Sequence, residues 1–143
     1  MKLCQPYFQT FIPLRQCMSD DILVIENVPV EGTFPEGGLI SIWTLNRPDK
    51  LNSLNSNSHK ALKEACELAE SNDSIRVIVI AGAPPNPPLE GRKSKPYSFA
   101  AGADISEFVG KNSDDVRPFF EDNAWERVWN LSKPCLLYTS DAA

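Results

Sequence analysis

The alternation of apolar and polar positions along the chain predicts strands and helices in a regular order. Short runs rich in β-branched residues predict strands at Ile22–Val28, Leu39–Leu45 and Arg76–Ala81. The last run is apolar without alternation, which is typical of a strand covered on both faces. Between the second and third strands, apolar residues recur at helical spacing and predict a helix from residue 55 or 56 to about residue 70. The order strand, strand, helix, strand predicts an α/β fold.

Two predicted helices have an apolar face. The face of the first consists of Leu54, Ala61, Ala65 and Leu68. The polar run Ser113–Asp115 suits a helix start, and a second helix is expected from about Asp114 to Leu131. Its apolar face consists of Val116, Phe119, Phe120, Ala124 and Val128, and we expect Trp125 and Trp129 to be packing residues as well.

Two stretches interrupt these regular elements. Val30–Gly38 contains proline and glycine and predicts a turn or short loop. Gly82–Ser98 is rich in proline, which excludes regular structure and predicts a long exposed loop. Its basic residues are Arg92, Lys93 and Lys95. We expect a solvated insertion here, with contact to the phosphates of a long ligand as the alternative.

The stretch Phe99–Phe108 is the one around which the chain is organised. The residues Ala100–Ala103 have little or no side chain, so another molecule can approach their backbone closely. Asp104 then opens a short helix, with Glu107 at the spacing of a capping box. Backbone N–H groups beside a helix start can hold a carbonyl oxygen that gains negative charge, as in an oxyanion hole. The alternative is an ordinary strand-to-helix turn that is small only for packing.

Length and composition are those of one globular domain. The chain has 143 residues, of which 42% are hydrophobic and 23% are charged. A formal net charge of -5 argues against nucleic acid as a partner, because phosphate binding needs a basic face. No apolar run is long enough to span a membrane.

Candidate metal ligands and nucleophiles are few. The four cysteines show no CxxC pairing and no metal spacing, so we expect the free thiols of a reducing compartment and no metal site; they are Cys4, Cys17, Cys66 and Cys135. His59 has no acid or nucleophile at a telling offset, and we expect it to be a surface or half-buried structural residue. Gly91–Ser94 lacks the spacing of a phosphate loop and no dinucleotide fingerprint is present, so neither nucleotide cofactor is expected.

The first seventeen residues differ from the body of the chain. They contain Lys2 and Arg15 but no acidic residue, and they show no clear amphipathic repeat. An organellar presequence and upstream translation before a start at Met18 account for them equally well. We therefore expect an N-terminal extension at 1–17 and a domain over 18–134.

Three blocks of sequence together resemble the crotonase superfamily. They are Ile42–Asn55, Val77–Gly82 and Phe99–Phe108, in the family's order, and Lys133-Pro134 matches the lysine-proline that precedes the family's next core strand. The resemblance covers roughly Asp21 to Pro134 and corresponds to the N-terminal half of the family's domain. Within the superfamily, the form Phe-Ala-Ala-Gly-Ala-Asp-Ile is most similar to enoyl-CoA hydratases.

This resemblance implies a truncated, crotonase-like spiral of ββα units that binds a fatty acyl-CoA thioester. It assigns the backbone N–H of Ala101 to the oxyanion hole as the catalytic group. The acyl-CoA site implied by the resemblance consists of Lys50, Leu51, Ala101, Gly102, Ala103 and Asp104, with the first two flanking the nucleotide end of coenzyme A. No separate cofactor is implied, since coenzyme A is part of the substrate. For a full-length protein, the implied reaction is hydration of 2-enoyl-CoA thioesters in fatty-acid β-oxidation or branched-chain acyl-CoA breakdown.

The sequence departs from the family after Pro134. The family's second oxyanion N–H and its two catalytic glutamates come after this point, but Cys135–Ala143 does not resemble the family's strand. This tail fits an in-frame translation of a transposase-type sequencing-library adapter, and we expect it to be non-native and the chain as given to be inactive. The alternatives are an enoyl-CoA isomerase of the same superfamily and a non-catalytic acyl-CoA-binding or structural fragment.

The resemblance also implies an assembly and a compartment. A full-length protein of this superfamily is expected to be a homo-oligomer, either a trimer or a hexamer. We expect a mitochondrial location, with peroxisomal and cytoplasmic locations as alternatives.

Overall fold

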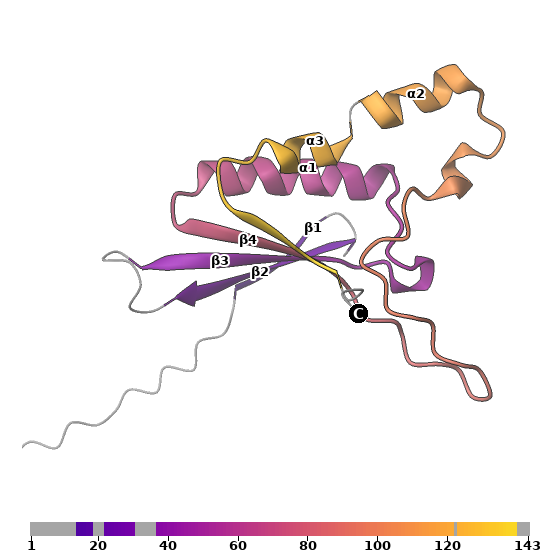
Figure 1. The fold of residues 1–143 in the computed structure, drawn as a ribbon, viewed down its shortest axis with the longest axis horizontal. Helices are drawn as coiled ribbons and strands as arrows, with labels where there is room; N and C mark the ends of the chain where they lie inside the picture. Colours follow the sequence, from indigo (N-terminus) through magenta and orange to yellow (C-terminus); the bar gives the residue numbers. More distant parts are fainter. Residues whose placement is uncertain (1–13, 19–21, 31–36, 122, 140–143) are drawn as a thin grey trace, which may run out of the picture.

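Strands and helices alternate along the chain in the computed structural model, which describes residues 14–18, 22–30, 37–121 and 123–139 (Figure 1). The strands are β1 (Leu14–Met18), β2 (Leu23–Val30), β3 (Gly38–Leu45), β4 (Ile75–Gly82) and β5 (Cys135–Tyr138). The α-helices are α1 (Ser56–Ser71), α2 (Ser113–Glu121) and α3 (Ala124–Trp129), and the short 3-10 helices are η1 (Pro48–Lys50) and η2 (Ile105–Phe108). The expected order strand, strand, helix, strand is confirmed in β2, β3, α1 and β4.

The described strands form one sheet in the order β1-β2-β3-β4-β5. The strands β1, β2 and β3 pair antiparallel, whereas β4 is parallel to β3 and β5 is parallel to β4. Each parallel step requires a crossover connection. The helix α1 provides the first crossover, and the long segment that contains η2, α2 and α3 provides the second. The result is the mixed α/β fold with the ββα order that the resemblance implies.

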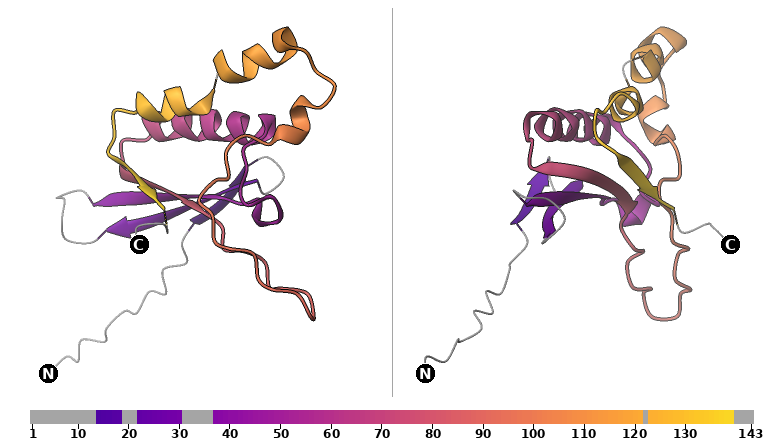
Figure 2. Two further views of the ribbon diagram at one scale, coloured as in Figure 1. Left: turned by 45° about the vertical axis from the view of Figure 1, so that its right-hand side comes forward. Right: turned by 60° about the vertical axis from the view of Figure 1, so that its left-hand side comes forward.

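The main helices lie on one face of the sheet, with α1 against the strands and α3 beside α1 (Figures 1 and 2). Alternate strand residues point toward this face and are almost completely buried, among them Trp43, Ile78 and Ile80. They belong to one cluster with Ala61, Leu62, Ala65 and Ala69 of α1. Burying a large apolar side chain contributes roughly 1.5–3 kcal/mol, so this interface is the main source of stability.

The helix α1 buries a slightly different face from the one expected. Its start at residue 56 is confirmed, because the Asn55 side-chain oxygen accepts a hydrogen bond from the Ser58 N–H (2.8 Å) and caps the helix. The buried face is centred on Leu62, which has no exposed surface. Leu68 is 47% exposed, so its assignment to the apolar face is wrong.

The prediction of a single helix over 114–131 is wrong, because this segment forms two helices, α2 and α3. The side-chain oxygen of Asn123 accepts hydrogen bonds from the N–H groups of Trp125 (3.0 Å) and Glu126 (3.3 Å). This cap starts a new helix instead of continuing the first one. Trp125 packs against the core as expected, but Trp129 is 88% exposed and is not a packing residue within the described structure.

The described ends of the chain extend the sheet. Residues 14–17, expected to belong to the extension at 1–17, form β1 with Met18 and pair with β2. Residues 135–138, expected to belong to the tail, form β5 in register with β4, from Ile78↔Cys135 to Ala81↔Tyr138. The rest of the extension and of the tail, and most of the turn expected at Val30–Gly38, lie outside the described residues. The origin of residues 135–143 stays a prediction.

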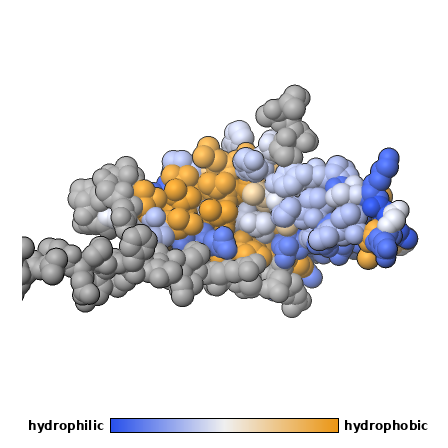
Figure 3. Space-filling view, turned by 90° about the horizontal axis from the view of Figure 1, so that it is seen from below, coloured by the Kyte–Doolittle hydropathy of each residue, from blue (hydrophilic) through white to orange (hydrophobic). Residues whose placement is uncertain are grey.

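The face of the sheet opposite the helices is apolar (Figure 3). Ile40 and Ile42 of β3 pair with Val77 and Val79 of β4 on this face, and all four side chains are only partly buried. The expectation that β4 is covered on both faces is therefore met on one face only within the described residues. In the same part of the chain, no helix has the length and apolar character needed to cross a bilayer.

Candidate functional site

The turn after Phe99 runs beside the segment that follows η1, and this contact forms the candidate site. The Ala101 N–H donates to the Leu51 carbonyl (3.0 Å), and the Leu54 N–H donates to the Gly102 carbonyl (2.8 Å). The Asp104 N–H donates in turn to the Leu54 carbonyl (2.8 Å). A short parallel bridge between Leu54 and Ala103 results. The structure therefore places Leu51 beside Ala101, and the assignment of these residues to one binding site stays a prediction.

Asn52 fixes the loop around this contact. Its side chain is buried, and its amide nitrogen donates to the carbonyls of Ala83 (2.9 Å) and Ser98 (2.8 Å), which lie at the two ends of the loop after β4. Its amide oxygen accepts from the Arg47 N–H (3.0 Å). Asn52 has a φ of 55°, a left-handed conformation that asparagine adopts more readily than most residues. One side chain thus closes a long, irregular loop and holds its ends next to the turn.

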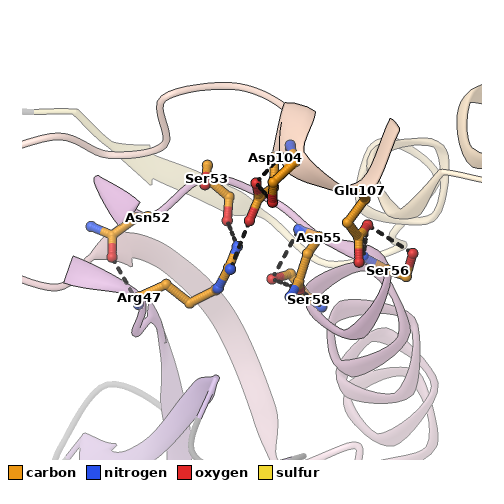
Figure 4. A network of polar contacts seen from close by, with 9 residues as sticks. Arg47, Asn52, Ser53, Asn55, Ser56, Ser58, Asp104 and Glu107 are labelled. Atoms are coloured by element: carbon orange, nitrogen blue, oxygen red, sulfur yellow. Dashed lines mark hydrogen bonds and ion pairs between the residues drawn. The ribbon is translucent and has the colours of Figure 1, made fainter. Parts of the chain in front are cut away.

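An ion pair holds the end of the turn. Arg47 donates from Nη2 to Oδ2 of Asp104 (2.8 Å) and from Nη1 to the Ser53 carbonyl (2.6 Å) (Figure 4). The other carboxylate oxygen of Asp104 accepts from the Ser106 hydroxyl (2.6 Å) and the Ser106 N–H (3.2 Å), which caps η2. Both carboxylate oxygens are therefore occupied by hydrogen bonds within the protein.

These partners keep Asp104 ionised. The hydrogen bond from the Ser106 hydroxyl, followed by that from the Arg47 guanidinium, lowers the pKa of Asp104 from its ordinary value of 3.8 to about 2. A general acid or base near neutral pH needs a pKa near the working pH. Asp104 is therefore held as a carboxylate, and its hydrogen bonds connect the turn to Arg47 and Ser106.

Glu107 binds the start of α1 and does not complete a capping box with Asp104. Its Oε2 accepts from the N–H (2.8 Å) and the hydroxyl (2.9 Å) of Ser56, the first residue of α1 (Figure 4). The expected capping box is wrong, because the free N–H groups at the start of α1 compete for this carboxylate. A negative charge is favourable there, because it faces the positive end of the helix dipole. The helix η2 is thus joined to Arg47 on one side and to α1 on the other.

The expected oxyanion donor is engaged elsewhere. The N–H of Ala101 donates to Leu51, which contradicts the expectation that this group is free to hold a substrate oxygen. Consecutive peptide groups of an extended chain point in opposite directions. Because the Gly102 carbonyl and the Asp104 N–H both point to Leu54, the intervening N–H of Ala103 points away from it. Among the described residues, the N–H of Ala103 has no hydrogen-bond partner.

An apolar cavity of about 280 Å³ adjoins the turn at this position. Gly102 and Ala103 form one side of it, and the side chains around it are Leu54, His59, Phe119, Phe120, Asn123 and Trp125. Gly102 has a φ of 91°, and a Cβ built there would meet no atom within 4 Å. The glycine is therefore required by the backbone conformation and leaves the backbone open to a ligand.

Lys50 and the basic loop lie at the other end of the site. Lys50 is exposed at the end of η1, next to Leu51. The loop after β4 is held against η1 by Asp49, whose carbonyl accepts from Lys95 Nζ (2.7 Å) and whose carboxylate accepts from Asn86 (2.9 Å). The loop is exposed, as expected, but part of its positive charge is thereby anchored near Lys50.

The described residues contain no group of three or more histidines, cysteines or carboxylates that could hold a metal ion. The carboxylates beside the turn, Asp104 and Glu107, are both bound to other parts of the protein. The arrangement can therefore hold an oxygen atom at a backbone N–H and an apolar chain in the cavity.

The sequence analysis did not assign several residues of this region to the site. Arg47 and Asn52 lie inside a block that carries the resemblance, but only the fold brings them to the turn. Phe119 and His59 meet edge to face, with ring centroids 4.7 Å apart. Nothing in the spacing of these two residues along the chain predicts that contact.

Comparison with known proteins identifies relatives over most of the chain. Residues 40–136 match the family described as enoyl-CoA hydratase/isomerase. A probable enoyl-CoA hydratase of Rhizobium meliloti is 33% identical over 108 residues, which are 74% of this chain and 37% of that protein. A short-chain-enoyl-CoA hydratase of Clostridium acetobutylicum is 32% identical over 69% of this chain and 34% of its own length.

Solved structures agree with these matches. The crystal structure of an enoyl-CoA hydratase/carnithine racemase from Magnetospirillum magneticum superimposes with a TM-score of 0.62 at 28% identity. The match covers 83% of this chain and 39% of that one. The chain therefore spans little more than a third of the length of the relatives that it matches.

Proposed function

Because the chain belongs to the enoyl-CoA hydratase/isomerase family, we propose that it binds the thioester group of an acyl-CoA and contributes this site to the hydration of 2-enoyl-CoA in a longer protein. The observation that supports the proposal most directly is the unpartnered N–H of Ala103 beside an apolar cavity. The thioester oxygen binds at this N–H, and the acyl chain enters the cavity. Lys50 and the neighbouring basic loop face the nucleotide end of coenzyme A.

Hydrogen bonding at the thioester oxygen is what makes hydration possible. It draws electrons from the conjugated double bond, so that water attacks the β-carbon, and it stabilises the enolate that results. Loss of one such donor costs about 3–4 kcal/mol of transition-state stabilisation. We place the second donor and the two carboxylates that handle water and protons in the part of a longer protein that follows residue 134.

Isomerisation within the same family is the second candidate. A 1,2-epoxyphenylacetyl-CoA isomerase of Escherichia coli is 35% identical over 58% of this chain. A polarised thioester also stabilises the charge formed in an isomerisation, so the site described above serves both reactions. Activity with 2-enoyl-CoA and water, compared with double-bond migration in 3-enoyl-CoA, distinguishes the two candidates. A fragment that binds acyl-CoA without catalysis remains the third candidate.

The assembly and the location of a full-length protein stay proposals. We propose a trimer or hexamer and a mitochondrial location, with coenzyme A entering only as part of the substrate. Size-exclusion chromatography with light scattering tests the first proposal, and microscopy of a tagged full-length protein tests the second.

Substitution of Gly102 tests the thioester site. A valine at a φ of 91° is strained by about 1–2 kcal/mol, and its side chain fills the open space beside the turn in which the ligand is proposed to bind. Gly37→Val is the matched control, because Gly37 also has a positive φ of 76° and open space but lies at the start of β3. We expect Gly102→Val to lose binding of hexanoyl-CoA in calorimetry, whereas Gly37→Val retains it at similar thermal stability.

Infrared spectra of hexanoyl-CoA labelled with ¹³C at the thioester carbonyl provide the direct readout. The carbonyl band is expected at lower frequency when the wild-type chain binds the ligand and at its free position with Gly102→Val. The same chain of residues 1–143 is expected to show no hydration above background, because the carboxylates beside the turn in the described part of the chain, Asp104 and Glu107, are bound to other parts of the protein. Tight binding without a shift of the carbonyl band would contradict the assignment of an oxyanion donor.

A further inference from the structure

His59 is the single histidine of the chain, and it lies in the first turns of α1 with only 7% of its surface exposed. It lines the apolar cavity beside Ala103 and also a second cavity, of about 400 Å³, between α1, η2 and α2. The sequence analysis expected a surface or half-buried structural histidine. In the structure His59 is buried and lines both cavities.

Two contacts connect His59 to the helices that follow η2. Its Nδ1 accepts a hydrogen bond from the N–H of Ala124 (3.0 Å), and this bond is buried. Ala124 is the first residue of α3 and has no exposed surface. The edge of one ring meets the face of the other where His59 contacts Phe119 of α2 (4.7 Å, 81°). One side chain of α1 therefore holds α2 and α3 together at their junction.

The hydrogen bond defines the chemical state of the ring. A nitrogen that accepts a hydrogen bond carries no proton, so the neutral ring carries its proton on Nε2. When Nδ1 takes up a proton, it becomes a donor and faces the N–H of Ala124, which is also a donor. The buried N–H of Ala124 then loses its acceptor, which is costly for a buried amide. The contact therefore exists only while His59 is neutral.

The residues held by this contact form one wall of the cavity beside the turn. Phe119 and Phe120 belong to α2, and Trp125 belongs to α3. Phe119 also packs edge to face against Phe108 of η2 (5.1 Å). We infer that His59 is the positioning residue of the acyl cavity: its neutral ring holds this aromatic wall in place, and its protonation releases the wall.

The second cavity beside His59 is bordered by charged groups of both signs. The second cavity is lined by Lys60, Lys63, Glu64 and Glu67 of α1, by Lys111 after η2 and by Asp115 of α2. Their positive and negative charges are equal in number. The change that disrupts the contact is the proton that Nδ1 takes up, because it turns the acceptor of the Ala124 N–H into a second donor.

The single histidine makes a structural test unambiguous, and this test does not depend on the proposed function. In the chain of residues 1–143 labelled with ¹⁵N, every imidazole signal arises from His59. At about pH 8 we expect the tautomer with its proton on Nε2 and slow hydrogen exchange at the N–H of Ala124. When the pH is lowered, the protection of the Ala124 N–H from hydrogen exchange is expected to disappear at the same midpoint pH at which the imidazole signals of His59 change. A proton on Nδ1 at about pH 8, or protection of Ala124 that persists through the titration, overturns the inference.

The role in ligand positioning rests on the proposed function and needs a binding test. His59→Asn keeps an acceptor close to the position of Nδ1 and cannot titrate, whereas His59→Leu keeps apolar bulk and removes the acceptor. The measured quantity is the preference for hexanoyl-CoA over coenzyme A at about pH 8 and about pH 5.5. Where the NMR titration shows the imidazole protonated, we expect the wild-type preference to be about tenfold lower, the net effect of one buried hydrogen bond. His59→Asn is expected to keep its preference at both values, and His59→Leu to have the reduced preference at both.

The outcomes separate the two ideas. If His59→Leu matches the wild type in preference and in pH dependence, the positioning role is wrong even though acyl-CoA binds. If the wild-type chain binds neither hexanoyl-CoA nor coenzyme A, the proposed function fails for this chain, and the tautomer and exchange measurements decide the contact alone. The NMR spectrum shows whether His59→Leu is folded. If it is not, the comparison of His59→Asn with the wild type at the two pH values tests the positioning role.

Discussion

Two side chains ahead of α1 hold the turn at Phe99–Phe108 in its conformation. Arg47 reaches Asp104 across 57 positions of sequence, and Asn52 joins both ends of the loop that precedes the turn. The side chains of Ala100–Ala103 are too small to hold the turn by themselves. The N–H of Ala103 therefore keeps its position because Arg47 and Asn52 hold the turn through these long-range hydrogen bonds.

The ionised state of Asp104 contributes to stability in a defined pH range. Its pKa in the folded protein is about 2, below the ordinary value of 3.8, so the contribution is present above pH 3.8 and is lost as the pH falls through 2. Asp104→Asn should therefore be less stable than the wild type at neutral pH, with a difference that narrows on acidification. Urea unfolding at several pH values measures this. The exposed residue Asp73 offers the control, and a constant difference for Asp104→Asn across the range would contradict the account.

At the scale of elements, α2, α3 and β5 are placed by side-chain caps. Asn123 separates α3 from α2, and His59 holds the first residue of α3. Glu70, at the end of α1, accepts hydrogen bonds from the N–H and the hydroxyl of Ser132 (both 2.7 Å), which lowers the pKa of Glu70. The second crossover thus follows α1 from its start to its end before β5 joins the sheet.

Removal of the cap at Asn123 should weaken this arrangement. Asn123→Ala takes the acceptor from the N–H groups of Trp125 and Glu126, and loss of such a cap costs about 1 kcal/mol. Asn123→Asp retains the acceptor and should remain close to the wild type. Chemical unfolding monitored by circular dichroism gives both values. Equal stability of the alanine and aspartate variants would show that the break between the helices has another cause.

For the whole molecule, the main feature is a sheet with helices on one face and an open apolar face on the other (Figure 3). Ile42 and Val79 are neighbours on the open face, and Val79 is paired with Leu136 of the edge strand β5. Exposed apolar patches of this kind favour association. This chain covers little more than a third of the relatives that it matches, and we propose that further chain covers this face in a longer protein.

Dye binding tests the open face. Residues 1–143 should bind a hydrophobic fluorescent dye and associate at high concentration, because the open face is apolar. The double variant Ile42→Lys, Val79→Lys places two charges on this face and should reduce both effects. Leu89→Lys is the control, because Leu89 is exposed in the loop after β4 and away from the sheet. Equal dye binding by the wild type and the double variant would show that the dye binds elsewhere.

Local signals in the sequence predicted the parts of the fold that depend on neighbouring residues. The β-branched runs predicted β2, β3 and β4, and the start of α1 was predicted at residue 55 or 56, because strand propensity and helix capping depend on nearby residues. The second helix was predicted wrongly because Val116 to Val128 keeps a helical spacing through the break at Asn123. Periodicity does not reveal a cap that interrupts it.

The sequence by itself determined the family, the ββα order and the turn at Phe99–Phe108, since each is encoded in residues close together along the chain. Only the tertiary structure decided that Leu51 takes the N–H of Ala101, whereas the N–H of Ala103 has no partner among the described residues. The hydrogen bonds of Glu107 with Ser56 and of His59 with Ala124 likewise depend on the tertiary structure. Hydrogen bonds between segments fifty or more residues apart depend on how the chain folds back on itself, and no local pattern records that path.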